Sequence, residues 1–228
     1  MENSIVIYTA ITDNYDQLRH NNLHNLLNFV AYLENYDSNA VSNVLDLSQV
    51  LPSKYKKLDA NRRAKWFKLH PHKLFPDFTY SIWIDGNVDL VGNVNELISE
   101  NMIKTGNLWA VFPHKSRNCI FDEAAACARL KKDDPILMFR QVSHYLQDKG
   151  YPRHNGLTEN TIIVRKHNHQ NVIQLNERWW QEILKWSKRD QLSFNYCCWQ
   201  LGFDYDKLEG TIYDNQYYKT QILHLPEN

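Results

Sequence analysis

The sequence predicts a single α/β domain with a mostly parallel central sheet flanked by helices. Short apolar, β-branched runs alternate along the chain with helical patterns, which is typical of β-α-β units. The 228 residues can bury a full core, and 43% hydrophobic with 23% charged residues is typical of a globular protein. No internal repeat or linker divides the chain. We therefore expect residues 1–228 to form one domain.

The first quarter of the chain predicts two strands and one helix. Residues 4–10 (SIVIYTA) are apolar and β-branched, as in a buried first strand, and a polar loop follows at residues 12–16. Apolar residues then recur every three or four positions, which predicts an amphipathic helix over residues 23–33. Residues 41–47 resemble a second strand.

The rest of the chain continues the alternation. A basic helical pattern over residues 58–74 is closed by Pro71 and Pro76, and YSIWID at 80–85 is apolar enough for a strand buried on both faces. The remaining expected elements are strands at 108–113 and 161–165 and helices at 121–130, 135–149 and around 179–186.

The charge balance and the cysteines limit the class of protein. The 26 basic residues equal the 26 acidic ones, which argues against a general nucleic-acid coat protein. No apolar run approaches the roughly 20 residues of a membrane span, and the polar N-terminus lacks a basic signal region. We expect a cytoplasmic protein with reduced thiols and no integral membrane segment; its cysteines are Cys119, Cys127, Cys197 and Cys198.

The sharpest chemical feature is the end of the strand at residues 80–85. Asp85, Gly86 and Asn87 follow it directly, and Asp89 comes two residues later. Hard divalent cations prefer such oxygen ligands, and glycine allows a close backbone approach. The same residues also suit an ordinary turn. Ligands of open α/β sheets lie beyond the carboxyl ends of strands, so this position favours a site.

A concentrated positive charge precedes that strand. Residues 54–73 contain eight Lys or Arg and one Asp, and Arg62 with Lys65, and Lys65 with Lys68, share a helix face. These side chains could neutralise a diphosphate. The alternative is a solvated helix face.

Several polar residues each permit two interpretations. Asp190 and Glu159 could act as catalytic carboxylates or as helix-capping and strand-end residues, and His114 stands at the end of a strand. His224 could be a late metal ligand or a buried structural histidine. The two H-x-H pairs, His70/His72 and His167/His169, lack a third ligand at zinc-site spacing.

An ordered set of motifs resembles a glycosyltransferase-like family first catalogued as a domain of unknown function, with plant members and members in bacterial surface-polysaccharide loci. The resemblance covers roughly residues 5–203, and its central motif is YSIWIDGN at 80–87. Arg189, Asp190 and Gln191 are also similar to the aspartate-glutamine element of the glycogenin-like family eight enzymes. The other motifs are VIYTA, DNYD, NRRAK, PHKLFP, HKSR, FDE, GYP, ENTII, WWQEI and SKRDQLSF.

The resemblance implies a GT-A fold and transfer of a sugar from a nucleotide-sugar donor to a glycan or lipid-linked saccharide acceptor. It implies surface-polysaccharide synthesis, with peripheral association at the inner membrane face if the acceptor is lipid-linked. The implied cofactor is Mn²⁺ or Mg²⁺, although Asp85-Gly86-Asn87 departs from a strict DxD motif. The implied donor site is Thr9, Ala10, Asp13, Tyr15, Arg62, Lys65, Trp83 and Asp85; the metal ligands are Asp85, Asn87 and His224; the catalytic residues are Asp190, Glu159 and His114.

Two other functions stay open at this level. The missing second carboxylate at Asn87 would also suit a non-catalytic nucleotide-sugar or glycan-binding module with a degenerate metal site. A metal-dependent hydrolase would instead be built on the histidine pairs, with His167 and His169 as the essential residues.

Overall fold

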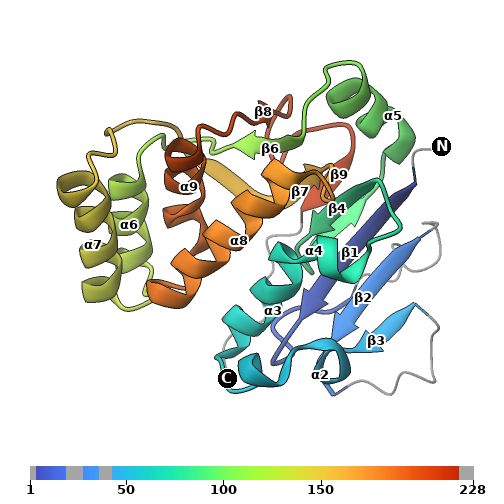
Figure 1. Cartoon of the computed structure of the whole chain (residues 1–228), viewed down its shortest axis with the longest axis horizontal. Coiled ribbons are helices and arrows are strands. Elements are labelled where there is room, and N and C mark those ends of the chain that lie inside the picture. The colour runs from blue at the N-terminus through green and yellow to red at the C-terminus, as the bar shows by residue number, and fades with distance from the viewer. Residues whose placement is uncertain (1–3, 19–27, 36–42, 221–228) are drawn as a thin grey trace.

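A seven-stranded sheet forms the centre of the computed structural model, which describes residues 4–18, 28–35 and 43–220 (Figure 1). Only β7 runs against the other strands of this sheet. The predicted mostly parallel α/β architecture is therefore confirmed. In spatial order the strands are β3 (Val44–Asp46), β2 (Phe29–Leu33), β1 (Ile5–Ile11), β4 (Tyr80–Ile84), β7 (Thr158–Arg165), β6 (Trp109–Pro113) and β8 (Asp206–Lys207).

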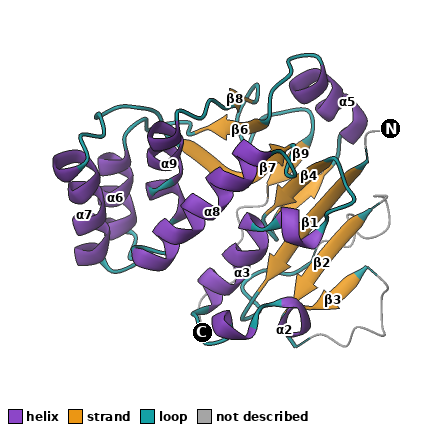
Figure 2. Cartoon of the chain, in the orientation of Figure 1, coloured by secondary structure: helices purple, strands orange, loops and turns teal. Residues whose placement is uncertain are grey.

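Helices surround the sheet, and α6, α7 and α9 gather at one end of the molecule (Figure 2). A small antiparallel pair, β5 (Val88–Leu90) with β9 (Tyr218–Thr220), adds a second sheet. The α-helices are α2 (Leu47–Val50), α3 (Ala60–Leu69), α4 (Pro71–Leu74), α5 (Val94–Ile98), α6 (Ile120–Arg129), α7 (Pro135–Ser143), α8 (Gln170–Lys185) and α9 (Phe194–Leu201). Shorter turns are the 3₁₀ segments η1 (Ser53–Tyr55) and η4 (Asp190–Leu192) and the π-helical segments η2 (Ser99–Ile103) and η3 (His144–Asp148).

The main sheet is buried on both faces, as the apolar run of β4 predicts. Tyr8 and Trp83 belong to the core cluster that contains residues of α3 and α8, whereas Ile7 and Ile82 belong to the cluster on the other face. Alternate residues of one strand point to opposite faces, so β1 and β4 each contribute to both cores. No helix among the described residues is both long and apolar enough to span a membrane.

The direction of β7 decides where the site forms. Ile84, the last residue of β4, pairs with Ile162, and Pro113 at the end of β6 pairs with Thr158. The first residues of β7 therefore lie at the edge where the parallel strands end. Glu159 is brought to that edge together with Asp85.

Residues 29–33 correct one prediction, because they form the strand β2 and not the end of a helix. They pair in parallel with β1, with Phe29 beside Ile7. Aromatic and β-branched residues favour a strand, and a short apolar run does not distinguish the two periods. Residues 23–27 lie outside the described residues.

Three other predicted elements have different bounds in the structure. The helix predicted over 58–74 divides into α3 and α4 at His70, the residue before Pro71, because proline disfavours a helical conformation in its predecessor. The helix predicted over 135–149 passes into the π-helical segment η3. The strand predicted at 41–47 is described only from Val44 to Asp46.

Candidate active site

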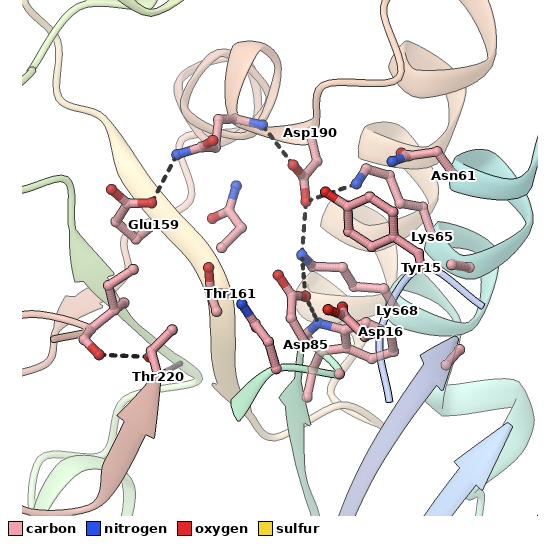
Figure 3. A pocket seen from close by; sticks show the side chains of 18 of the residues that line it. Tyr15, Asp16, Asn61, Lys65, Lys68, Asp85, Glu159, Thr161, Asp190 and Thr220 are labelled. Atoms are coloured by element: carbon pink, nitrogen blue, oxygen red, sulfur yellow. Dashed lines mark hydrogen bonds and ion pairs between the residues drawn. The ribbon is translucent and has the colours of Figure 1, made fainter. Parts of the chain in front are cut away.

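A polar cavity of about 330 Å³ opens where β1 and β4 end and β7 begins (Figure 3). Elements distant in the sequence meet there, including α3, the loop after β4 and the η4 turn. Its lining residues are Ala10, Tyr15, Asp16, Asn61, Ala64, Lys65, Lys68, Trp83, Asp85, Gly86, Asn87, Lys132, Glu159, Asn160, Thr161, Arg189, Asp190, Gln191, Ile212, Tyr213 and Thr220.

One face of α3 supplies the cations. Asn61, Lys65 and Lys68 recur at helical spacing and all line the cavity. The opposite face buries Trp66 and Phe67 in the core, which fixes the rotation of the helix.

Asp190 is the centre of the charged network. Its Oδ2 lies 2.8 Å from Lys68 Nζ and 3.7 Å from Lys65 Nζ. Burial opposes ionisation of Asp190, but the charges of Lys65, Lys68 and Arg189 outweigh it and hold the pKa of this carboxyl well below its usual range. Burial lowers the pKa of Lys65 to about 8, against the opposing attraction of Asp190. The carboxylate thus keeps two ammonium groups inside the protein.

The carboxyl group of Asp85 faces the same lysine from the end of β4. Its Oδ1 accepts a hydrogen bond of 2.7 Å from Trp83 Nε1 and lies 3.5 Å from Lys68 Nζ. At Gly86, a Cβ atom would come within 2.8 Å of Asp16 Cβ and 2.9 Å of Ile11 Cδ1. Glycine therefore allows the loop after β1 to pack against the loop after β4.

Glu159 forms the opposite wall of the cavity. Gln191 Nε2 donates to its Oε2 at 3.1 Å, and His114 Nε2 lies 3.2 Å from its Oε1. Burial, together with the negative charge of Glu123, raises the pKa of Glu159 to about 7. This carboxyl group therefore changes protonation state near neutral pH.

Some polar atoms of the cavity residues are buried without a hydrogen-bond partner: Asn61 Oδ1, Asn160 Nδ2 and Arg189 Nε. Buried polar groups are nearly always paired in folded proteins. Three unpaired groups in the wall are compatible with a polar ligand in the cavity.

The cavity brings together most of the predicted site residues, and four described ones do not line it. Arg62 donates to the carbonyl oxygens of Ile183 and Trp186 and so connects α3 to α8. His114 lies behind Glu159, Thr9 is buried in β1, and Asp13 lies near Arg63 with a backbone N–H that donates to Glu34. The predicted residues that line the cavity are Ala10, Tyr15, Lys65, Trp83, Asp85, Asn87, Glu159 and Asp190. His224 lies outside the described residues.

Other lining residues were given no individual role from the sequence. Asp16, Asn61, Asn160 and Thr161 lie within the motifs DNYD, NRRAK and ENTII, whereas Lys132, Ile212, Tyr213 and Thr220 lie outside any quoted motif. Asn61 had a usable signal, because it continues the polar face of Lys65 and Lys68. Lys132 and Thr220 had none, since they reach the cavity only through tertiary contacts.

Asp85 and Asn87 suit a hard divalent cation in their chemistry, because both offer oxygen ligands at the cavity. Trp83 and Lys68 approach Oδ1 of Asp85, so the cation would have to share this carboxylate with them. Mg²⁺ and Mn²⁺ commonly use one or two protein carboxylates together with substrate phosphates. The residues therefore fit a cation that binds with a diphosphate.

The side chains of the two H-x-H pairs contact groups other than a metal site. His70 Nε2 and His72 Nε2 lie 3.7 Å and 3.2 Å from the carboxylate of Glu177, and His167 Nε2 lies 2.8 Å from the carbonyl oxygen of Phe75. Within the described residues, neither pair belongs to a group of three metal-ligating side chains. These contacts do not favour a hydrolase built on the pairs.

Residues 1–224 match the domain family described as TOD1/MUCI70, glycosyltransferase-like domain. A probable hexosyltransferase, MUCI70 of Arabidopsis thaliana, is 27% identical over 148 residues. That match covers 60% of this chain and 25% of the plant protein, so the chain spans about a quarter of its relative.

Two solved structures share the fold. The bifunctional glycosyltransferase WbbM in its apo form aligns with a TM-score of 0.55 and 11% identity, covering 91% of this chain and 39% of that one. Mouse xyloside xylosyltransferase 1, also apo, aligns with a TM-score of 0.52 and 9% identity, covering 90% and 84%. Both are GT-A glycosyltransferases, so the predicted GT-A fold is confirmed.

Proposed function

The chain belongs to the TOD1/MUCI70 glycosyltransferase-like family, and on that premise we propose that it transfers a hexose from a nucleotide sugar to a glycan or lipid-linked saccharide. One observation carries the proposal. Lys65 and Lys68 meet Asp85 and Asp190 inside a single cavity at the strand ends. Paired ammonium groups beside a cation-binding carboxylate suit a diphosphate.

The donor would lie across the carboxyl ends of β1 and β4. Ala10 and Tyr15 line the side expected for the nucleoside, and Lys65 and Lys68 would contact the diphosphate. Asp85 and Asn87 would hold Mn²⁺ or Mg²⁺. A bound cation would supply positive charge to the departing diphosphate.

The sugar and the acceptor would lie toward β7 and η4. Asp190 stays ionised, so it can position both lysines and stabilise positive charge that develops at the anomeric carbon. The pKa of Glu159, about 7, suits it to accept a proton from the acceptor hydroxyl, the step that an inverting reaction requires. His114 would orient Glu159 from behind.

The resemblance to surface-polysaccharide enzymes supports a role in polysaccharide synthesis on the cytoplasmic side. A lipid-linked acceptor would bring the reaction to the inner membrane face. This placement rests on the family relationship.

A transfer assay with a panel of nucleotide sugars and saccharide acceptors tests the proposal. We expect wild-type turnover with Mn²⁺ or Mg²⁺, its loss with EDTA, and roughly 100-fold less turnover in Lys68→Met, the scale of losing one charge-stabilising group. Lys104→Met is the matched control, because Lys104 is exposed and pairs only with Glu100 at the surface.

Two outcomes would contradict parts of the proposal. Turnover that survives EDTA would exclude the cation. A nucleotide sugar that binds without transfer to any acceptor would instead favour the non-catalytic binding module, for which Asn87 in place of a second carboxylate gives grounds.

A further inference from the structure

We infer that Cys119, Asp122 and His154 form a second metal site, for a zinc-type transition-metal ion, away from the nucleotide-sugar cavity. Their potential ligand atoms all lie within 4.8 Å of one another. Cys119 is the N-cap of α6, Asp122 belongs to its first turn, and His154 lies in the loop before β7. None of the three lines the cavity described above.

The ligand set selects the kind of ion. A thiolate, an imidazole and a carboxylate are typical of Zn²⁺ or Co²⁺, whereas Mg²⁺ and Mn²⁺ prefer oxygen ligands alone. Ligand atoms around tetrahedral Zn²⁺ lie about 3.3–3.8 Å apart, from the usual zinc–ligand lengths. Asp122 and His154 are exposed, so their side chains can rotate to close the remaining distance. Three protein ligands leave the fourth position to water.

Neighbouring groups already orient two of the ligands. His154 Nδ1 lies 2.8 Å from Asn118 Oδ1, an acceptor, so the ring proton is held on Nδ1 and the lone pair is on Nε2. The backbone carbonyl of Asn118 also accepts from Gly156 N at 3.1 Å, which holds the loop in place. Cys119 is held at the N-cap of α6, where its backbone carbonyl oxygen accepts a hydrogen bond from Glu123 N at 3.1 Å.

An ion at this site would support the acceptor side of the proposed active site. It would fasten the loop of residues 149–157 to the start of α6. That loop continues into Glu159, and the carbonyl of Leu157 accepts a hydrogen bond from His114 N at 2.9 Å. The ion would therefore act on stability and order in this wall, with no part in the chemistry.

Cobalt titration of the full, reduced chain tests the site without any need for activity. Co²⁺ binding displaces the Cys119 thiol proton to solvent and forms a Co–S bond. We expect a near-ultraviolet thiolate-to-cobalt band at one ion per chain, together with the intense visible bands of tetrahedral Co²⁺. Zn²⁺ should remove these bands and raise the melting temperature.

Variants assign the ligands. Cys119→Ser should abolish the thiolate band, and His154→Ala, at an exposed position, should weaken Co²⁺ binding at least tenfold. Asn118→Ala should weaken it by about 10–100-fold, as expected for the partner of a ligating imidazole. His144→Ala is the control, because His144 pairs with Asp148 elsewhere on the surface. A wild-type chain without the band, or a band that persists in Cys119→Ser, would overturn the inference.

Discussion

Asp190 keeps its negative charge inside the protein because two ammonium groups face it. Only 5% of the residue is exposed, and Lys68 Nζ lies 2.8 Å from its Oδ2. Removing one partner of a buried pair leaves the others uncompensated. The Asp190 carboxylate therefore also stabilises the fold, in addition to its proposed role in transfer.

Asp190→Asn should lower both stability and activity. Lys65 would lose its nearest counter-charge and Lys68 would keep only the more distant Asp85, so the free energy of unfolding should fall by about 3 kcal/mol. Transfer should fall by at least 100-fold. Denaturant unfolding at neutral pH and the transfer assay measure these effects, with the exposed Asp77→Asn as control. Unchanged stability would show that the charges are not coupled.

Glu159 should give the activity a pH dependence near neutrality. If its carboxylate form accepts the proton, turnover should rise as pH increases through about 7, the pKa of this group. Glu159→Gln should be poorly active and should lose that rise. A pH–rate profile for both proteins decides the point, and a wild-type profile flat from pH 6 to 8 would contradict it.

Protein stability should change with pH in the opposite sense. The pKa of Glu159 is raised on folding, so its favourable contribution is complete below about pH 4.5, the unfolded value, and is lost as pH rises through about 7. Glu159→Gln should therefore be more stable than the wild type at pH 8. Thermal unfolding at pH 5 and pH 8 measures the difference, and equal melting temperatures at pH 8 would contradict the raised pKa.

At the scale of elements, two loops pack closely because residue 86 has no side chain. Gly86→Ala would force the loop after β1 away from the loop after β4, since the new Cβ would lie 2.8 Å from Asp16 Cβ. We expect a loss of about 1–3 kcal/mol in stability and at least tenfold weaker donor binding. Calorimetric titration with the donor measures the affinity.

Gly150→Ala is a useful comparison, because φ there is +71° and a Cβ would meet nothing within 4 Å. It should lose about 1 kcal/mol through backbone strain and leave donor affinity unchanged. Equal affinities in both alanine variants would show that the packing at Gly86 does not shape the donor site.

Arg62 connects α3 to α8, so its replacement should act on stability and not on the donor. Arg62→Ala leaves the carbonyl oxygens of Ile183 and Trp186 without this donor, which should cost about 2 kcal/mol. The KM for the donor should change less than twofold when measured well below the melting temperature. A tenfold rise in KM with unchanged stability would contradict this account and would indicate that Arg62 contacts the diphosphate.

Much of the fold could be predicted from local sequence pattern. The wrong predictions arose where a local pattern fitted more than one structure. The apolar runs of β1, β4 and β6 needed no distant information. β2 was mistaken for a helix because its apolar residues also fit a period of 3.6, and only pairing with β1 decides between the two. Arg62 shared a helix face with Lys65, but its contacts with α8 could not be anticipated from that spacing.

Parts of the site depend on contacts over long sequence separations. Lys68 and Asp190 are 122 residues apart, yet their side chains meet at 2.8 Å. The sequence indicated Lys68 as part of a basic helix face and Asp190 as a candidate catalytic carboxylate. It did not indicate that the two side chains contact each other. Their pairing arises only after β7 reverses direction and the η4 turn reaches α3.

At the scale of the whole molecule, the mostly parallel sheet with one antiparallel strand brings the residues that line the cavity to one edge of the sheet. Residues from β1, α3, β4, β7 and η4 reach it from both halves of the sequence. The chain spans about a quarter of its plant relative.

Donor binding tests the central claim most directly. Thermal unfolding with a panel of nucleotides and nucleotide sugars, with and without Mn²⁺, should reveal one nucleoside diphosphate that stabilises the wild type. At 100 times its dissociation constant the gain should be about 2.7 kcal/mol, dependent on Mn²⁺ and lost in Lys68→Met. If no nucleotide or nucleotide sugar stabilises the protein under either condition, the cavity is not a donor site and the proposed function is wrong.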